Sequence, residues 1–244
     1  MPEGPSIVIL REEAAHLTGM RITHATGNTR LDKSRFVGQT IVALRSWGKH
    51  FLIDFGAFSL RVHFLLFGSY AVDARRPDAS PRLSLRGAQG ELNLYACSLR
   101  FIEAPLDEVY DWRTDVMSDA WSAARARRKL RERPELLVCD AILDQEIFAG
   151  VGNIMKNEVL FRIRVHPLST VGALPDAKRN ALVREARVYA FEFLAWKKQH
   201  VLKKHWLAHT RSICPRCNVP FVKGKLGRTQ RRSFYCTLCQ VLYT

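Results

Sequence analysis

Apolar residues recur at helical spacing over the first twenty positions, and the pattern then becomes strand-like. Ile7, Leu10, Ala14 and Leu17 are three or four residues apart, which predicts an N-terminal helix. From about Arg21 to Phe101, short runs of β-branched, aromatic or alternating residues are bounded by Gly, Asn, Asp or Pro. About six to eight strands fit this region, and we expect them to form an antiparallel sandwich.

The second half of the chain has a helical pattern from near Asp111 to about Gln199. Ser118 is the expected N-cap of the segment SDAWSAARARRKLRER, and Pro134 is the expected start of the next helix. The segment GVGNIMKNEVLFRIRV predicts another helix, and a long periodic run follows Pro175. The sequence therefore predicts an α+β protein with a β-rich half, a helical half and a short tail.

The composition is that of a globular protein with an excess of positive charge. Of the 244 residues, 47% are hydrophobic and 25% are charged, and 38 Lys and Arg against 23 Asp and Glu give a formal net charge of +15. Such a charge indicates a polyanionic partner, most often nucleic acid, although a merely basic surface is an alternative. The sequence has no secretory signal and no apolar run long enough to span a membrane, so we expect a cytoplasmic protein.

Four of the six cysteines form two CxxC pairs near the end of the chain. Their spacing, C-x2-C-x18-C-x2-C, is typical of a closed structural zinc site and not of a disulfide framework. The expected ligands of one zinc ion are Cys214, Cys217, Cys236 and Cys239. Cys97 and Cys139 lie inside apolar runs, so we expect both to be ordinary buried core residues.

The segment between the two CxxC pairs, FVKGKLGRTQRRSFY, predicts a hairpin with arginines near its tip. These arginines are Arg228, Arg231 and Arg232, and residues 201–244 contain no acidic residue. Arginines in this position are suited to contact phosphate. A solvated basic face is the alternative, and the absence of acidic neighbours favours the phosphate contact.

The first residues, Met1-Pro2-Glu3, offer a possible nucleophile. If an aminopeptidase removes Met1, the α-amine of Pro2 would have a pKa of about 7.7–8.0, so part of it would be unprotonated near neutral pH. An unprotonated amine can attack an electrophilic carbon and form an iminium intermediate. Glu3 beside it could act as an acid or a base. Many proteins begin with Met-Pro for no chemical reason, so these residues alone do not establish this role.

Four motifs together resemble the bacterial formamidopyrimidine-DNA glycosylase/endonuclease VIII family of base-excision repair enzymes. They are PEGP at the N-terminus, WGKHFLIDF, GVGNIMKNEVL and the ending QRRSFYCTLCQ. The resemblance implies a catalytic β-sandwich with a leading helix over residues 1–115, a helix–two-turns–helix DNA-binding domain over 116–205 and a zinc finger over 206–244. It also implies a monomeric, nucleoid-associated protein of bacterial type that acts on damaged double-stranded DNA.

The resemblance assigns catalytic roles to four residues. Pro2 matches the nucleophile that attacks C1′ of a damaged nucleotide, and Glu3 matches the acidic partner that supplies a proton during base release. Lys49 matches the lysine assigned as proton donor in β-elimination. Arg231 matches the zinc-finger arginine that grips phosphates around the flipped nucleotide, with Arg232 one residue away as the alternative. The expected activity is that of a bifunctional DNA glycosylase and AP lyase.

Further residues are expected to contact DNA. Asn153 matches the asparagine of the helix–two-turns–helix element, and Lys156 lies on the same helix. Leu65, Leu66 and Phe67 match the loop that fills the void left by an extruded base, although a place in the core of a strand is the alternative. Arg100 matches an arginine that faces the orphaned base in one branch of the family.

Several features leave the substrate and the activity open. Ser6 stands where family members commonly carry glutamate. PEGP is closer to the endonuclease VIII branch, whereas Arg100 and QRRSFYC are closer to the formamidopyrimidine branch, so the preferred lesion is not fixed. A catalytically silent DNA-binding protein on the same scaffold is the alternative function. A zinc-ribbon RNA-binding protein would leave the motifs in the first half unexplained.

Overall fold

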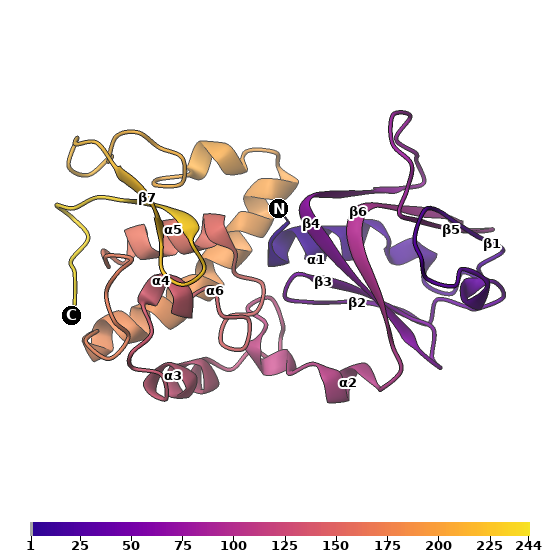
Figure 1. Ribbon diagram of the computed structural model, residues 1–244, viewed down its shortest axis with the longest axis horizontal. Coiled ribbons are helices and arrows are strands. Elements are labelled where there is room, and N and C mark those ends of the chain that lie inside the picture. Colours follow the sequence, from indigo (N-terminus) through magenta and orange to yellow (C-terminus); the bar gives the residue numbers. More distant parts are fainter. Residues whose placement is uncertain (1) are drawn as a thin grey trace. The chain divides into compact units, whose positions relative to one another are not determined.

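The computed structural model describes residues 2–244, which belong to two compact units, Met1–Asp111 and Trp112–Thr244 (Figure 1). The first unit holds one antiparallel sheet, and the second holds the longer helices and a small two-stranded sheet. The predicted α+β class is confirmed. The expected removal of Met1 concerns a residue that lies outside the described part of the chain.

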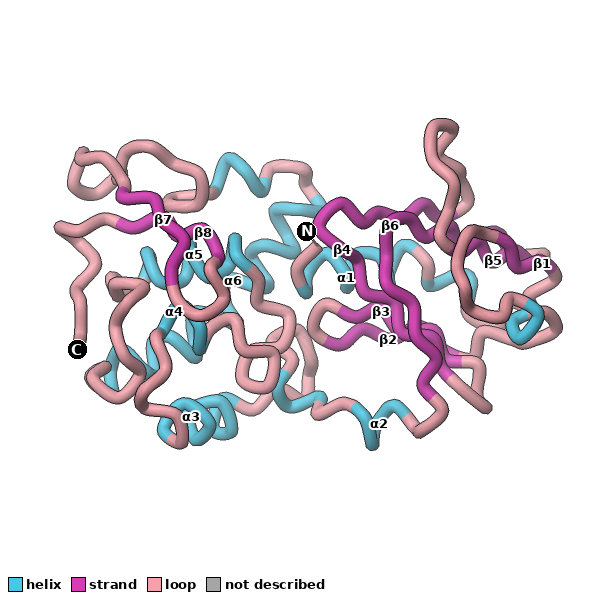
Figure 2. The backbone as a smooth tube through the Cα atoms, in the orientation of Figure 1, coloured by secondary structure: helices cyan, strands magenta, loops and turns pink. Residues whose placement is uncertain are grey.

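The N-terminal unit begins with helix α1 (Gly4–Glu13) and continues with six strands hydrogen-bonded into one sheet (Figure 2). The order across the sheet is β1-β5-β6-β4-β3-β2, and each neighbouring pair is antiparallel. Where we expected a sandwich, the strands form one continuous antiparallel sheet, and its two longest strands, β4 and β6, are neighbours at its centre. The strands are β1 (His24–Thr26), β2 (Ala43–Trp47), β3 (His50–Asp54), β4 (Ser59–Val72), β5 (Leu83–Gly87) and β6 (Gly90–Ile102).

The core of this unit forms where α1 packs on β2 and β3. Ile7, Leu10, Ala14 and Leu17 are at most 1% exposed, as their spacing predicted. They pack with alternate residues of the strands in one hydrophobic cluster. Burial of this apolar face, at about 25 cal/mol per Å² of apolar surface, is what holds the first residues of the chain in a defined place. Short helical turns complete the unit: Ala15–Leu17, Ser34–Phe36 and α2 (Leu106–Val109).

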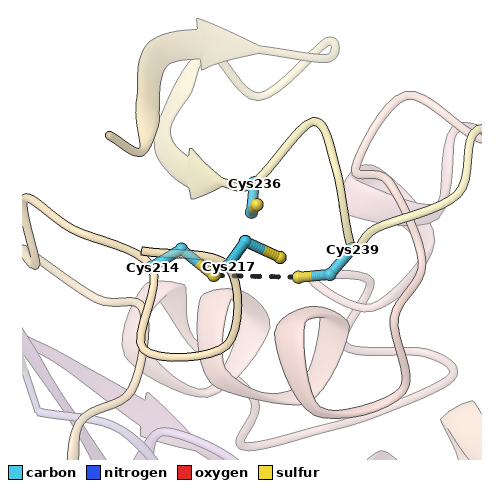
Figure 3. A group of neighbouring side chains, drawn as sticks. All are labelled: Cys214, Cys217, Cys236 and Cys239. Atoms are coloured by element: carbon cyan, nitrogen blue, oxygen red, sulfur yellow. Dashed lines mark hydrogen bonds between the residues drawn. The ribbon is translucent and has the colours of Figure 1, made fainter. Parts of the chain in front are cut away.

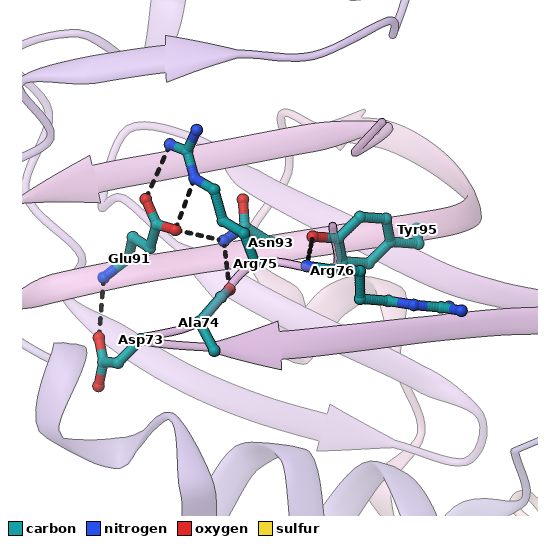
Figure 4. A network of polar contacts seen from close by, with 7 residues as sticks. All are labelled: Asp73, Ala74, Arg75, Arg76, Glu91, Asn93 and Tyr95. Carbon is teal, nitrogen blue, oxygen red and sulfur yellow. Dashed lines mark hydrogen bonds and ion pairs between the residues drawn. The ribbon is translucent and has the colours of Figure 1, made fainter. Parts of the chain in front are cut away.

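The long connection from β4 to β5 is anchored by a polar network (Figure 4). The Glu91 carboxylate accepts two hydrogen bonds from the Arg75 guanidinium, at 2.8 and 2.9 Å. The Asn93 amide donates to the Ala74 carbonyl at 2.8 Å, and Asp73 Oδ1 accepts from the Glu91 amide at 2.9 Å. These bonds tie residues 73–75 to β6.

The C-terminal unit is helical, with the small sheet formed by β7 and β8 near its end. Its helices surround a second hydrophobic cluster, which includes Val159, Val183 and Tyr189. None of the helices among residues 2–244 is long and apolar enough to cross a membrane. The elements are Trp112–Thr114, α3 (Ala123–Arg131), α4 (Val138–Ala141), α5 (Asn153–Arg162), α6 (Asp176–Lys198), Leu202–His205, β7 (Val222–Leu226) and β8 (Arg231–Tyr235).

Two expected helix starts in this unit are wrong. Ser122, and not Ser118, caps α3, because its hydroxyl oxygen accepts from the Arg125 amide at 3.2 Å while Ser118 lies in the preceding turn. Pro134 does not begin a helix. Residues 134–136 form a turn, and Leu137 forms an isolated β-bridge with Thr170, so α4 starts only at Val138. Tertiary pairing has overridden the local signal at this position.

Candidate functional site

The start of α1 fixes Pro2 and Glu3. Glu3 is the N-cap residue of the helix, and its carbonyl accepts hydrogen bonds from the amides of Ser6 and Ile7, at 2.8 and 3.4 Å. The Glu3 side chain is 2% exposed, and Pro2 is half-buried beside it. Ser6, which stands in place of the usual glutamate, is 7% exposed. The structure thus places Pro2 next to a buried carboxyl group at the start of α1.

Lys49 lies at the tip of the hairpin between β2 and β3. Trp47 and His50 are paired across the two strands, so Gly48 and Lys49 form a two-residue turn. Gly48 has a φ of 55°, a left-handed conformation that glycine adopts without the strain that a Cβ would cause. Lys49 is half-buried. The sheet therefore holds the Lys49 backbone firmly while its long side chain can extend from the turn.

An aromatic cluster supports this hairpin, and sequence reasoning missed it. His50 Nδ1 is 3.2 Å from the hydroxyl of Tyr110, and Trp47 Nε1 donates to the Asp111 carbonyl at 3.1 Å. The Trp47 and Tyr110 rings pack at 5.0 Å between centroids. Burial, followed by the positive charges of Arg61 and, more weakly, Lys49, lowers the pKa of His50 to about 3. His50 is therefore neutral near pH 7. The position of His50 directly after Lys49 in WGKHF was the sequence feature that could have indicated this cluster.

Leu65, Leu66 and Phe67 are extruded from the sheet. Phe64 pairs with Cys97 and Ser69 pairs with Tyr95, so residues 65–68 of β4 lie opposite a single residue of β6. This bulge leaves the three side chains 50%, 56% and 84% exposed, respectively. Phe64 just before them is 2% exposed. The alternative of a place in the core of the strand is therefore wrong for all three.

Two arginines face each other next to this bulge. Arg100 on β6 is exposed and is the cross-strand partner of Arg61 on β4. Like charges directly opposite each other repel and weaken a sheet. A bound polyanion would relieve this repulsion. Arg61 was not among the residues expected from the sequence, although it follows β3 by only a short turn.

In the C-terminal unit, α5 binds the hairpin formed by β7 and β8. Asn153 is the first residue of α5, and its Nδ2 donates to the Arg232 carbonyl at 3.0 Å. Lys156 is 1% exposed, and its ammonium donates to Ser233 Oγ at 2.8 Å and to the Arg232 carbonyl at 3.2 Å. We expected Lys156 to contact DNA, but here its ammonium is inside the protein and holds β8.

Two further residues of α5 were missed by sequence reasoning. Glu158 is fully buried, and its carboxylate accepts hydrogen bonds from three successive backbone amides at 2.7–2.9 Å. Those amides belong to Leu207, Ala208 and His209. Asn157 accepts from the Phe234 amide at 3.1 Å. The KNE triplet of GVGNIMKNEVL was the signal, because buried polar side chains require partners.

The four cysteines predicted to bind zinc converge (Figure 3). Their sulfur atoms all lie within 4.8 Å of one another, and the Cys214 and Cys239 sulfurs are 3.8 Å apart. Four thiolates at about 2.3 Å from one zinc ion would be about 3.8 Å apart in a tetrahedron. The donor set therefore fits a closed metal site. Arg216 links it to α5, donating to the Phe161 carbonyl at 2.7 Å and lying 4.0 Å from the Cys239 sulfur.

The other two cysteines take no part in a metal cluster. Cys97 is 4% exposed and Cys139 is 1% exposed. Burial raises the pKa of each thiol to about 11. Both are therefore core residues, as expected.

Arg231 is the first residue of β8 and pairs with Leu226 across the hairpin. Arg232 and Arg228 are exposed, and Arg231 is half-buried. The expected hairpin with arginines near its tip is thus present.

Two family models match this chain. The formamidopyrimidine-DNA glycosylase N-terminal domain matches residues 1–102, and the formamidopyrimidine-DNA glycosylase H2TH domain matches residues 114–199. Together they cover most of the chain, and their boundary lies close to the division between the two compact units.

Curated relatives include endonuclease 8-like proteins of animals. Endonuclease 8-like 3 of Mus musculus is 29% identical over 213 residues, which are 84% of this chain and 35% of the relative. Endonuclease 8-like 2 of Homo sapiens is 32% identical over 195 residues, which are 74% of this chain and 57% of the relative. The chain thus spans between about a third and just over half of the length of these relatives.

Solved structures share the fold. A formamidopyrimidine-DNA glycosylase of Lactococcus lactis, non-covalently bound to DNA containing an AP site, aligns with a TM-score of 0.84 at 21% identity and covers 98% of this chain and 99% of that chain. A viral DNA glycosylase gives the same TM-score at 18% identity. From the two family models, the relatives and the shared fold, the chain belongs to the formamidopyrimidine-DNA glycosylase/endonuclease VIII family of DNA-repair glycosylases.

Proposed function

We propose that this protein is a bifunctional DNA glycosylase and AP lyase that removes oxidised bases through an iminium intermediate on Pro2. The observation that carries the proposal is the pairing of Pro2 with the buried Glu3 at the start of α1, in a chain whose first 102 residues match the family's N-terminal domain. A nucleophile held on a rigid element beside an acid has the arrangement that covalent catalysis requires.

The chemistry follows from these groups. The Pro2 nitrogen attacks C1′ of the damaged nucleotide, the bond from C1′ to the base breaks, and the base leaves with a proton for which Glu3 is the donor. The Pro2 nitrogen passes its proton to the Glu3 carboxylate, which returns it to O4′ as the C1′–O4′ bond breaks. The product is an iminium ion between Pro2 and C1′, which acidifies the C2′ protons. Loss of a C2′ proton expels the 3′ phosphate, and a second elimination expels the 5′ phosphate. Lys49, at the tip of its hairpin, is the proton donor for the first elimination.

DNA capture would use the exposed groups of both units. The target nucleotide must leave the stack before C1′ can be reached, and apolar side chains can fill the gap. The exposed Leu65, Leu66 and Phe67 suit this role. Arg100 would face the orphaned base, and Asn153 and Arg231 would contact phosphates. The net charge of +15 favours binding to the phosphate backbone of duplex DNA.

The four-cysteine cluster would hold one zinc ion with a structural role. A site with four protein ligands has no open position for substrate, so its contribution is to fold the hairpin that carries Arg231.

We propose that the protein acts as a monomer on damaged double-stranded DNA in a nucleoid-associated location. We also propose that its domains are 1–115, 116–205 and 206–244.

Borohydride trapping tests the proposal. A duplex with an abasic site or an oxidised base should yield a covalent protein–DNA adduct and a cleaved strand, and Pro2→Gly should abolish trapping. Mass spectrometry of the active protein should show Pro2 as the first residue. Full activity with Met1 retained, or equal trapping by Pro2→Gly, would show that the nucleophile is another group.

The preferred lesion is tested with the native protein on a panel of duplexes. The panel contains 8-oxoguanine, formamidopyrimidine, thymine glycol, dihydrouracil and an abasic site. Cleavage of any of these duplexes supports a lyase activity. The order of the cleavage rates shows which class of lesion the protein prefers. Tight binding without cleavage of any of them would instead support the catalytically silent DNA-binding protein.

A further inference from the structure

The hairpin that carries Arg231 cannot be positioned by zinc alone. Cys236 follows directly after β8, so the metal fixes the base of the hairpin. Arg231 is at the other end of β8, next to the turn. A two-stranded hairpin is marginally stable by itself in water, so its tip needs other contacts.

Asp140, on α4, supplies such a contact at the turn. Its two carboxylate oxygens accept hydrogen bonds from the backbone amides of Arg228 and Thr229, at 2.8 and 3.1 Å. Gly227 before them has a φ of 68°, and a Cβ at this position would collide with the Asp140 carboxylate. The turn therefore lies directly on the carboxylate. Hydrogen bonds to an ionised acceptor are the stronger kind.

Lys156 supplies the second contact, just after Arg231. Its buried ammonium donates to the Arg232 carbonyl and to Ser233 Oγ. The same carbonyl accepts from Asn153 Nδ2 at 3.0 Å and Asn157 Nδ2 at 3.3 Å. Ser233 is 1% exposed. Arg231 is thus bracketed, with the Asp140 contact two residues before it and the Lys156 contact one residue after it.

We propose that Asp140 and Lys156 are positioning residues that set where β8 presents the Arg231 guanidinium to a DNA phosphate. This inference rests on the phosphate contact proposed for Arg231. Neither residue needs to touch DNA, since each acts on the backbone that carries Arg231. The inference also gives Lys156 a function that agrees with its burial.

The test measures binding to a duplex with a tetrahydrofuran abasic analogue, which the protein cannot cleave, at several salt concentrations. Asp140→Asn is nearly isosteric but replaces one accepting oxygen with a donor that faces an amide. Asp140→Asn should raise the dissociation constant about tenfold. It should also lower the slope of log Kd against log salt by about one, the value expected for one lost phosphate contact. Arg231→Ala should have the same effect. The double variant should be no weaker than Arg231→Ala.

Controls separate positioning from folding. Asp119→Asn removes an exposed carboxylate of the same unit and should leave the affinity and the salt slope unchanged. Metal analysis should give the same zinc content for Asp140→Asn as for the native protein. Gly227→Ala, which displaces the turn and leaves Asp140 intact, should reproduce the loss. Lys156→Met, if it folds with zinc bound, should do the same.

The outcomes are distinguishable from those of the trapping experiment. A native salt slope and affinity in Asp140→Asn, with both reduced in Arg231→Ala, would overturn the inference. An unchanged slope in Arg231→Ala would also overturn it, because no phosphate contact would then exist to position. A protein that binds this duplex as described but gives no borohydride adduct would retain the positioning role and lose the proposed chemistry.

Discussion

Two hairpins in this protein each carry a cation that the proposed chemistry uses, and their stability comes from different sources. The hairpin of β2 and β3 has Lys49 in a two-residue turn and is one edge of a six-stranded sheet that packs on α1. The hairpin of β7 and β8 has Arg231 beside its turn and, within residues 2–244, pairs with no third strand. The first is held by burial of an apolar face of a large sheet, whereas the second combines a four-cysteine cluster and polar contacts with the packing of Leu226 and Phe234.

This difference shows in the residues behind each hairpin. Phe51, Leu52 and Ile53 of β3 are fully buried. Behind β8 lie Lys156 and Asn157 of α5, each hydrogen-bonded to its backbone. Hydrogen bonds need donor–acceptor distances within a narrow range, so several of them to one carbonyl fix the position of the β8 backbone closely. We therefore expect the second hairpin to be well positioned when complete and to fail when one partner is removed.

Removal of the metal should give the largest effect. A structural zinc site of this kind contributes about 10–16 kcal/mol to folding. Chelation, or Cys236→Ser, should therefore unfold the β7–β8 hairpin and leave β3 folded. Hydrogen exchange measures this directly, with amides of 222–235 losing protection and amides of 50–54 keeping it. Cys97→Ala, which changes a buried thiol outside the cluster, should leave the zinc content unchanged. Equal loss of protection in both hairpins would show that the two units unfold together.

Glu158→Gln should give the next largest effect. The carboxylate accepts three backbone amides, and glutamine replaces one acceptor with a donor that repels an amide. The expected loss is about 1–3 kcal/mol in the free energy of unfolding of the C-terminal unit, measured by chemical denaturation. Glu135→Gln, at an exposed carboxylate of the same unit, is the control. A loss no larger than that of the control would show that the 207–209 segment does not depend on Glu158.

The sequence predicted the N-terminal core and the β7–β8 hairpin with its cysteines, but not the side-chain-to-backbone contacts of the C-terminal unit. Helical spacing identified Ile7 and Leu10 as core residues, because burial of one face is a local pattern that repeats. The cysteine spacing identified the four-cysteine cluster, because the spacing within each CxxC pair is also a local pattern. Asp140 and Glu158 were missed because each binds backbone amides 49 or more residues away. The KNE triplet indicates that Glu158 needs a partner, but no sequence pattern identifies which backbone amides supply it. The bulge at 65–67 was ambiguous because exposed and buried apolar runs look alike in sequence.

Gly48→Ala should weaken the first hairpin by a smaller amount. A Cβ in the left-handed conformation costs roughly 1–2 kcal/mol, and the sheet should absorb this cost without unfolding. Displacement of the turn should slow strand cleavage at an abasic site, measured under single-turnover conditions. Gly19→Ala is the control, since Gly19 also has a positive φ of 86° and lies outside the hairpin. Both variants should lose similar stability, and only Gly48→Ala should lose cleavage rate.

The smallest effect at neutral pH should come from two half-buried histidines, His50 at the start of β3 and His209, which packs against Phe234 of β8. Burial is the main cause that lowers the pKa of His50 to about 3 and that of His209 to about 4, while the unfolded chain has the ordinary value near 6.5. The unfolded state therefore binds more protons below pH 6.5, so stability is lost as the pH falls from 6.5 towards 4. The slope for each residue is at most about 1.4 kcal/mol per pH unit.

Substitution of each histidine assigns this acid sensitivity to its own unit. His50→Gln should flatten the pH dependence of unfolding of the N-terminal unit, and His209→Gln that of the C-terminal unit, followed by hydrogen exchange at pH 5 and pH 7. His205→Gln, at an exposed histidine, should change neither. If His50→Gln instead flattened the profile of both units, the acid response would pass between them, and the separate stabilisation of the two hairpins would not hold. The rings that pack on His50, Trp47 and Tyr110, belong to its own unit. We therefore expect the acid responses of the two units to stay separate.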